Sequence, residues 1–107
     1  MEPTPVNPIA YAIRLIGGKW KIPILWALSK QDAIRYSDIR AYVDGITDMM
    51  LSQCLRELVR DGLLERRQYG EIPPRVDYAL TDAGRSLQPA LKAMALWGLS
   101  QMQKAPR

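Results

Sequence analysis

The hydrophobic period of the chain changes from helical to strand-like at Gly62, and this change most restricts the folds open to it. Before Gly62, apolar residues recur at the three- and four-residue spacing of amphipathic helices. After it, Val76, Tyr78 and Leu80 alternate with other residues, as expected for one face of a half-buried strand. A chain of 107 residues builds a single small core. The sequence therefore predicts one mainly α domain over residues 1–107 with a small β-hairpin.

Two helices are predicted near the amino end. Asn7 and Pro8 begin the first, because Asn is a favoured helix cap and Pro fits the first helical position. The second runs from near Trp20 to about Ser29. We expect residues 30–34 to form only a connector.

A second, closely spaced pair of helices is predicted over about residues 36–61. We interpret Ser37 as the cap of a short helix. Thr47 caps the next helix, which covers residues 48–61 and stops at Gly62. Two helices joined by a short, glycine-containing turn are typical of a helix-turn-helix motif.

The predicted hairpin, or wing, covers about residues 63–80. Pro73 and Pro74 belong in its loop, since proline cannot donate a ladder hydrogen bond. Thr81 then caps one last helix over about residues 82–103, which carries an apolar stripe.

The residue types that are missing exclude much enzyme chemistry. With no His and a single Cys, Cys54, the chain builds no Cys/His zinc site, no internal disulfide and no His-based catalytic pair. We therefore expect no enzyme activity, no metal and no cofactor. Residues 1–5 are acidic and Pro-rich, unlike a targeting signal, so we expect a cytoplasmic protein with no membrane partner.

On a helical wheel, the predicted helix 48–61 has an apolar side and a polar side. The inward residues are Leu51, Cys54, Leu55, Leu58 and Val59. The outward strip consists of Met49, Gln53, Arg56 and Arg60, with Ser52 at its edge. Arg, Gln and Ser reach base edges and phosphates in a DNA major groove, but a merely solvated helix face has a similar composition. The hairpin that follows, with Arg75 in its loop, favours DNA binding, because this order of elements places one helix in the major groove and a wing on the backbone.

Charge alone does not identify this surface. The chain carries a net charge of +4, yet residues 35–75 hold seven basic and seven acidic residues. All seven cations are arginines, which suit bidentate contacts with bases and phosphates. The neutral balance leaves an alternative open: a winged-helix module that binds other proteins rather than an operator.

Six separated motifs occur in order and nearly without gaps over about residues 7–98. They are Ile16-Gly17-Gly18-Lys19-Trp20-Lys21; Arg35-Tyr36-Ser37-Asp38-Ile39; Gly45-Ile46-Thr47; Leu51-Ser52-Gln53 with Leu55-Arg56-Glu57-Leu58; Asp61-Gly62-Leu63; and Ile72-Pro73-Pro74-Arg75-Val76-Asp77-Tyr78 with Leu80-Thr81 and Gly84. In this combination the chain resembles the HxlR family of winged helix-turn-helix transcriptional regulators, which are MarR-like.

The resemblance implies a bacterial regulator that dimerises through its terminal helices and binds double-stranded DNA at near-palindromic operators. It implies that Arg35 and Ser37 hold phosphates and that Arg75 contacts DNA from the wing, residues 69–75. The full set of expected DNA-binding residues is Arg35, Ser37, Thr47, Met49, Ser52, Gln53, Arg56, Arg60 and Arg75. For three of these residues a role within the chain is the alternative to DNA contact. Arg35 would pair with a carboxylate, Ser37 would act as a helix cap, and Met49 would pack inside the chain.

The terminal helices are more apolar than one small core requires, which independently indicates a homodimer. The expected dimerisation residues are Ile9, Ile13, Leu87, Leu91, Met94 and Trp97.

The expected signal input differs from that of many family members. Many carry a sensing Cys immediately before the Pro that opens the first helix, where this chain has Asn7. Cys54 falls on the inward side of its helix and is interpreted as a small core residue. The resemblance therefore does not extend to thiol sensing. The signal that the protein senses is not indicated by the sequence, and an unidentified small-molecule effector is one candidate.

Overall fold

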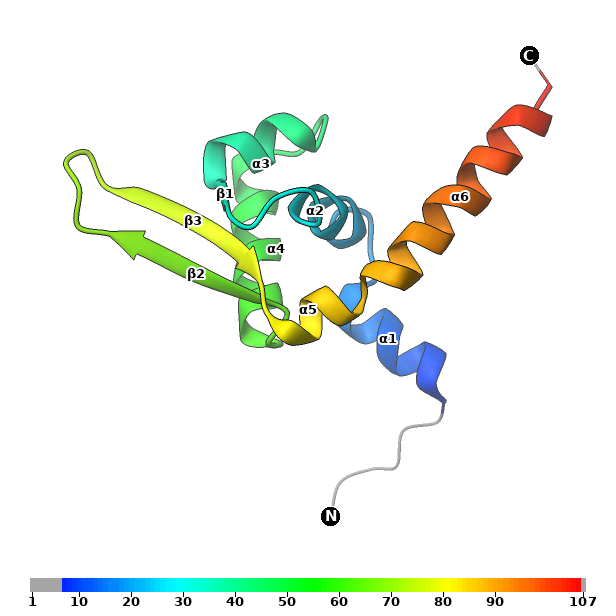
Figure 1. The fold of residues 1–107 in the computed structure, drawn as a ribbon, viewed down its shortest axis with the longest axis horizontal. Coiled ribbons are helices and arrows are strands. Elements are labelled where there is room, and N and C mark those ends of the chain that lie inside the picture. The colour runs from blue at the N-terminus through cyan, green and yellow to red at the C-terminus, as the bar shows by residue number, and fades with distance from the viewer. Residues whose placement is uncertain (1–6, 107) are drawn as a thin grey trace.

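The computed structural model describes residues 7–106; the segment 1–5, interpreted above as no targeting signal, lies outside them. Figure 1 shows helices packed around a small sheet, with a hairpin projecting on one side and a long helix on the other. The elements in chain order are α1 (Pro8–Ile16), α2 (Lys21–Leu28), β1 (Ile34–Arg35), α3 (Tyr36–Tyr42), α4 (Asp48–Arg60), β2 (Leu64–Tyr69), β3 (Arg75–Leu80), α5 (Asp82–Ser86) and α6 (Gln88–Lys104). This architecture confirms the prediction of a mainly α winged helix-turn-helix fold.

The sheet has three antiparallel strands in the order β1-β3-β2, one more than the predicted hairpin. The added strand is β1, where Ile34 pairs with Tyr78 and Arg35 with Asp77. The expectation that residues 30–34 form only a connector is therefore wrong at Ile34. A two-residue strand is too short to show a period, and its pairing partner lies far along the chain.

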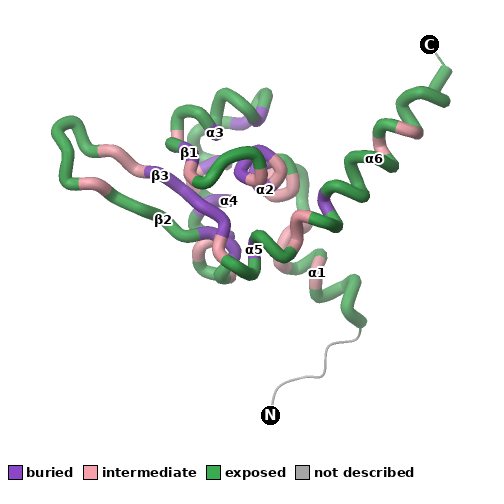
Figure 2. Tube along the Cα trace, viewed as in Figure 1, coloured by how far each residue is buried: buried purple, intermediate pink, exposed green. Residues whose placement is uncertain are grey.

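Strand β3 is the centre of the sheet and is buried on both faces along its second half (Figure 2). Tyr78 and Leu80 lie in the core, as the alternation predicts. Asp77 and Ala79 on the opposite face are buried as well, so the strand is more than half-buried.

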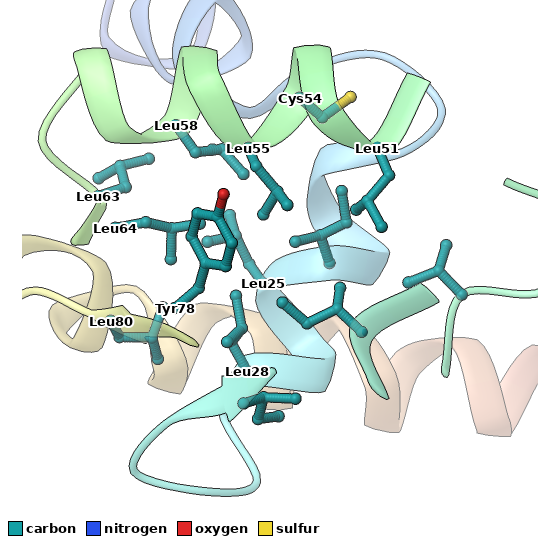
Figure 3. Packing of buried hydrophobic residues seen from close by; sticks show 14 of the residues in the cluster. Leu25, Leu28, Leu51, Cys54, Leu55, Leu58, Leu63, Leu64, Tyr78 and Leu80 are labelled. Atoms are coloured by element: carbon teal, nitrogen blue, oxygen red, sulfur yellow. The ribbon is translucent and has the colours of Figure 1, made fainter. Parts of the chain in front are cut away.

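The core lies between the sheet and helices α2, α3 and α4. In Figure 3, Leu51, Leu55 and Leu58 of α4 point toward Leu25 of α2 and Tyr78 of β3. Each of these leucines is at most 1% exposed. This packing fixes α4 against the sheet and turns its other side to solvent.

Local capping places three helix starts where the sequence predicts them. The side chains of Asn7, Thr47 and Thr81 accept hydrogen bonds from the backbone amides at the starts of α1, α4 and α5. The interpretation of Ser37 as a cap is wrong, because Arg35 occupies the cap position of α3 and no side chain caps that helix. Strand β1 runs directly into α3, so the helix begins before Ser37.

The single helix expected over residues 82–103 is two helices, α5 and α6, which meet at Leu87. The cause is Pro89, the second residue of α6. Proline has no amide proton to donate to the carbonyl of Arg85, and its ring would clash with that carbonyl in a continuous helix. A proline in the first turn of a new helix carries no such cost.

The two terminal helices reach beyond the core (Figures 1 and 2). Helix α1 contains no buried residue, and α6 contains one, Leu91. Both helices therefore expose most of their length.

Candidate nucleic-acid interface

Helix α4 presents a continuous polar strip opposite the face that it buries. Thr47 caps the helix by accepting a hydrogen bond from the amide of Met50 at 3.1 Å. Met49 is 78% exposed, so it does not pack inside the chain. The predicted outward residues Gln53, Arg56 and Arg60 are all exposed, and Ser52 at the edge is half-buried. The wheel prediction is thus confirmed for this helix.

The start of α4 is fastened to α3 through Tyr36. The Tyr36 hydroxyl lies 3.1 Å from Asp48 Oδ1 and 3.2 Å from Ser52 Oγ. Arg40 Nε of α3 pairs with the same Asp48 oxygen at 3.2 Å. These polar contacts hold the two helices of the motif at a fixed relative position along the exposed edge.

The middle of α4 is fastened to α2 by an ion pair. Lys21 Nζ lies 2.8 Å from Glu57 Oε1, and Gln53 Nε2 donates to the other Glu57 oxygen at 3.2 Å. The hydrogen bond from Lys21, followed by that from Gln53, lowers the pKa of Glu57. The negative charge of Glu57 beside the outward strip is therefore balanced within the chain by Lys21.

Arg35 and Ser37 lie next to the wing. Both line a hollow of about 520 Å³ whose opposite wall contains Pro73, Pro74 and Arg75. Arg35 is exposed and forms no ion pair with a carboxylate of residues 7–106, so the carboxylate-pairing alternative finds no support there. The structure thus brings together three of the residues predicted to contact the DNA backbone.

Arg75 is held more tightly within the chain than the sequence indicates. Its guanidinium lies over the Tyr69 ring, 4.2 Å from the centroid. Its nitrogens also lie 3.7 Å from Glu71 and 3.6 Å from Asp77. These contacts lie within its own hairpin, next to the loop, and give this side chain a structural role in the wing.

Arg66 of β2 is a candidate that the sequence reasoning missed. It lies directly opposite Tyr78 in the sheet and therefore on the face that α4 covers. Arg66, Arg56 and Ser52 line one hollow of about 250 Å³. Alternation within β3 alone does not place Arg66, because the hairpin register decides which residue of β2 lies opposite Tyr78.

The seven arginines of residues 35–75 divide into two groups. Four pair with carboxylates: Arg40 with Asp48, Arg60 with Asp61, Arg67 with Glu65, and Arg75 with Glu71 and Asp77. The other three, Arg35, Arg56 and Arg66, pair with no carboxylate within residues 7–106. Residues 35–75 are neutral overall, yet three of their arginine side chains form no ion pair with a described acidic residue and are available to contact DNA.

Comparison with known proteins decides the family. The model of the HxlR-like helix-turn-helix family matches residues 15–106. The chain belongs to the HxlR-like helix-turn-helix family.

Relatives and solved structures agree with this assignment. The HTH-type transcriptional regulator YdzF of Bacillus subtilis is 43% identical over 94 residues, which cover 88% of this chain and 86% of YdzF. The oxidized form of the redox regulator HypR superposes with a TM-score of 0.83 at 37% identity, covering 88% of this chain and 96% of HypR. The HTH-type regulator ytcD gives a TM-score of 0.85 at 37% identity, over 92% of this chain and 99% of ytcD. This HxlR-like chain is a helix-turn-helix transcriptional regulator and not an enzyme.

The two positions relevant to thiol chemistry have structural roles in this HxlR-like chain. Asn7 caps α1, where its side chain accepts a hydrogen bond of 2.7 Å from the amide of Ala10. Cys54 is 7% exposed and packs in the core. Burial, followed by the nearby Glu57 charge, raises the pKa of the Cys54 thiol. A buried thiol with a raised pKa is a weak nucleophile, so Cys54 is a core residue as predicted.

Within residues 7–106, no group of three or more Cys, Asp or Glu side chains is arranged to hold a metal ion. None of the helices described is both long enough and apolar enough to cross a membrane.

Proposed function

We propose that the chain is a sequence-specific DNA-binding regulator in which α4 enters the major groove and the wing, residues 69–75, follows the backbone or minor groove. One observation carries the proposal: Arg56 is exposed at the centre of the α4 strip and pairs with no carboxylate of residues 7–106. An unpaired guanidinium there is available for a bidentate contact with guanine or phosphate. Arg35 and Arg66 supply further positive charge on either side.

The proposal includes a homodimer formed by α1 and α6. Ile9 and Ile13 of α1 are 70% and 60% exposed, and Met94 and Trp97 of α6 are 50% and 68% exposed. Large apolar side chains at this exposure favour association with a second copy. Leu87 and Leu91 pack against the chain's own core and support the base of α6. A two-fold dimer with its α4 helices about 34 Å apart fits a near-palindromic operator.

We further propose that residues 1–107 act as one domain and that the protein works in the cytoplasm. The wing, the helix-turn-helix and α6 share one core, because Leu91 packs in the same cluster as Leu55 and Tyr78. This shared core supports the assignment of a single domain.

A salt titration tests the DNA proposal. Binding of the protein to duplex DNA from upstream of its own gene is followed by fluorescence anisotropy, with a scrambled duplex of equal length as the control. We expect the logarithm of the association constant to fall linearly with the logarithm of the salt concentration, with a slope of about −0.9 per phosphate contacted. Affinity that does not change with salt contradicts phosphate contact. Equal affinity for both duplexes contradicts sequence specificity, and no binding to either favours the protein-interaction module.

Sedimentation tests the dimer. At micromolar concentration we expect the mass of two chains, and Trp97→Asp is expected to reduce it to the mass of one chain, because a charge then replaces the exposed aromatic ring of α6. A single-chain mass for the unchanged protein contradicts the proposed homodimer.

A further inference from the structure

The Tyr36 hydroxyl lies within hydrogen-bond distance of three oxygen atoms at once. These are the backbone carbonyl oxygen of Asp48 at 3.2 Å, the Asp48 carboxylate Oδ1 at 3.1 Å and Ser52 Oγ at 3.2 Å. Tyr36 is the first residue of α3, whereas Asp48 and Ser52 lie one turn apart on α4. The cluster therefore sits at the edge of the strip that we place in the major groove.

The chemistry of the three groups fixes the direction of each hydrogen bond. A tyrosine hydroxyl has a single proton to donate. The Asp48 carbonyl oxygen only accepts, and so does the Asp48 carboxylate, which pairs with Arg40 at 3.2 Å. The Tyr36 proton is therefore directed to Asp48. The remaining contact then requires Ser52 to donate to the Tyr36 oxygen, so that the hydrogen bonds run from Ser52 through Tyr36 to Asp48.

This direction limits what Ser52 is able to bind on its solvent side. A serine hydroxyl has one proton and two lone pairs, and here the proton is used inside the protein. Ser52 therefore only accepts from the outside. Phosphate oxygens, guanine O6 and N7, and thymine O4 are themselves acceptors and do not suit it. The donors in the major groove are the amino groups of adenine (N6) and cytosine (N4).

We infer that Ser52 is a specificity-determining residue that accepts a hydrogen bond from the amino group of an adenine or a cytosine, and that Tyr36 is the positioning residue that commits it to this role. The inference rests on the proposed function, in which α4 lies in the major groove. Ser52 shares a hollow with Arg56, which only donates. The two neighbouring side chains thus present opposite hydrogen-bonding polarity to the DNA.

Selection of duplexes from a random library, followed by sequencing, measures base preference at every position. The proteins compared are the unchanged chain, Ser52→Ala, Tyr36→Phe and the matched control Tyr42→Phe. Tyr42 is also on α3 and is 56% exposed, and its hydroxyl makes no hydrogen bond with the residues described, 7–106. Circular dichroism spectra establish that all four chains are folded.

We expect the unchanged chain to prefer adenine or cytosine over guanine or thymine by about tenfold at one operator position. Ser52→Ala should abolish the preference at that position alone. Tyr36→Phe frees the Ser52 proton to rotate outward, so guanine or thymine should become accepted there. Tyr42→Phe should retain the preference of the unchanged chain.

Three results overturn the inference while leaving the proposed function intact. They are a preference for guanine or thymine at the position that Ser52→Ala relaxes, a uniform loss of affinity in Ser52→Ala without any change in base preference, and an unaltered preference in a folded Tyr36→Phe chain. If the unchanged chain enriches no sequence at all, the proposed function itself fails, and the inference fails with it.

Discussion

Replacing Gly84 by alanine is expected to destabilise the fold, although alanine is the better helix former. Gly84 is a buried residue of α5, which follows directly from the end of β3. A Cβ atom there would overlap the backbone carbonyl oxygen of Leu63 and lie 3.1 Å from a methyl carbon of Leu80. The Leu63 oxygen is also the acceptor for the amide of Thr81, at 3.1 Å. It therefore cannot move aside without breaking the contact that seats α5 against the start of β2.

The opposing free energies decide the sign. Helix propensity favours alanine over glycine by about 1 kcal/mol. Forcing an extra carbon into a packed site costs about 1–3 kcal/mol, and loss of the hydrogen bond from Thr81 to Leu63 costs about 1 kcal/mol more. We expect a net loss of about 1–3 kcal/mol in the free energy of unfolding.

Urea unfolding, followed by circular dichroism at one fixed protein concentration, measures this loss. Gly98→Ala in α6 is the matched control, because no atom lies within 4 Å of the Cβ that it adds. We expect that control to gain about 0.5–1 kcal/mol from helix propensity alone. Sedimentation verifies that all three chains have the same oligomeric state, since dimer formation also shifts unfolding midpoints. A Gly84→Ala chain as stable as the unchanged one would refute the steric argument.

Two further predictions concern the interface and its support. Arg56→Ala should weaken operator binding by about 1–3 kcal/mol and relax discrimination at one base pair. The control Arg67→Ala removes an arginine that is already paired with Glu65, so it should change the affinity by only about a few tenths of a kcal/mol. Anisotropy titrations on operator variants measure both affinities. For Glu57, hydrogen bonds from Lys21 and Gln53 lower the pKa of the folded carboxylate below its unfolded value. Its contribution to stability is therefore present above the unfolded pKa and lost as the pH falls through the folded pKa, so Glu57→Gln should make urea midpoints less dependent on pH in the acidic range. An unchanged pH dependence would contradict the role given to Lys21.

Local signals were sufficient for most of the helix boundaries. The caps at Asn7, Thr47 and Thr81 act on amides three residues away, so their effect is contained in a short stretch of sequence. The break at Leu87 also has a local cause, Pro89, but the apolar stripe continues across it and hides the break in the hydrophobic pattern. Strand β1 and the start of α3 depend instead on pairing with β3, which no local pattern reports.

The inward and outward faces of α4 were likewise predictable, because a helix of known period must bury its apolar side. What each outward residue is free to do was not predictable. Ser52 looks like any surface serine in the sequence, and only the position of Tyr36 directs its proton inward. Arg66 is placed beside Arg56 by the register of the hairpin.

The sequence by itself determined the fold class, the family and the face of α4 that turns to solvent, because periodicity, caps and turns are short-range properties of the chain. Residues 35–75 hold seven basic and seven acidic residues, so the net charge of this segment alone indicates no attraction for DNA. Only the tertiary structure decided which charges cancel. Ion pairs form between atoms a few ångströms apart, and the distances between them depend on how strands and helices pack. That packing pairs four arginines with carboxylates and leaves Arg35, Arg56 and Arg66 without a carboxylate partner in the part of the chain described, 7–106.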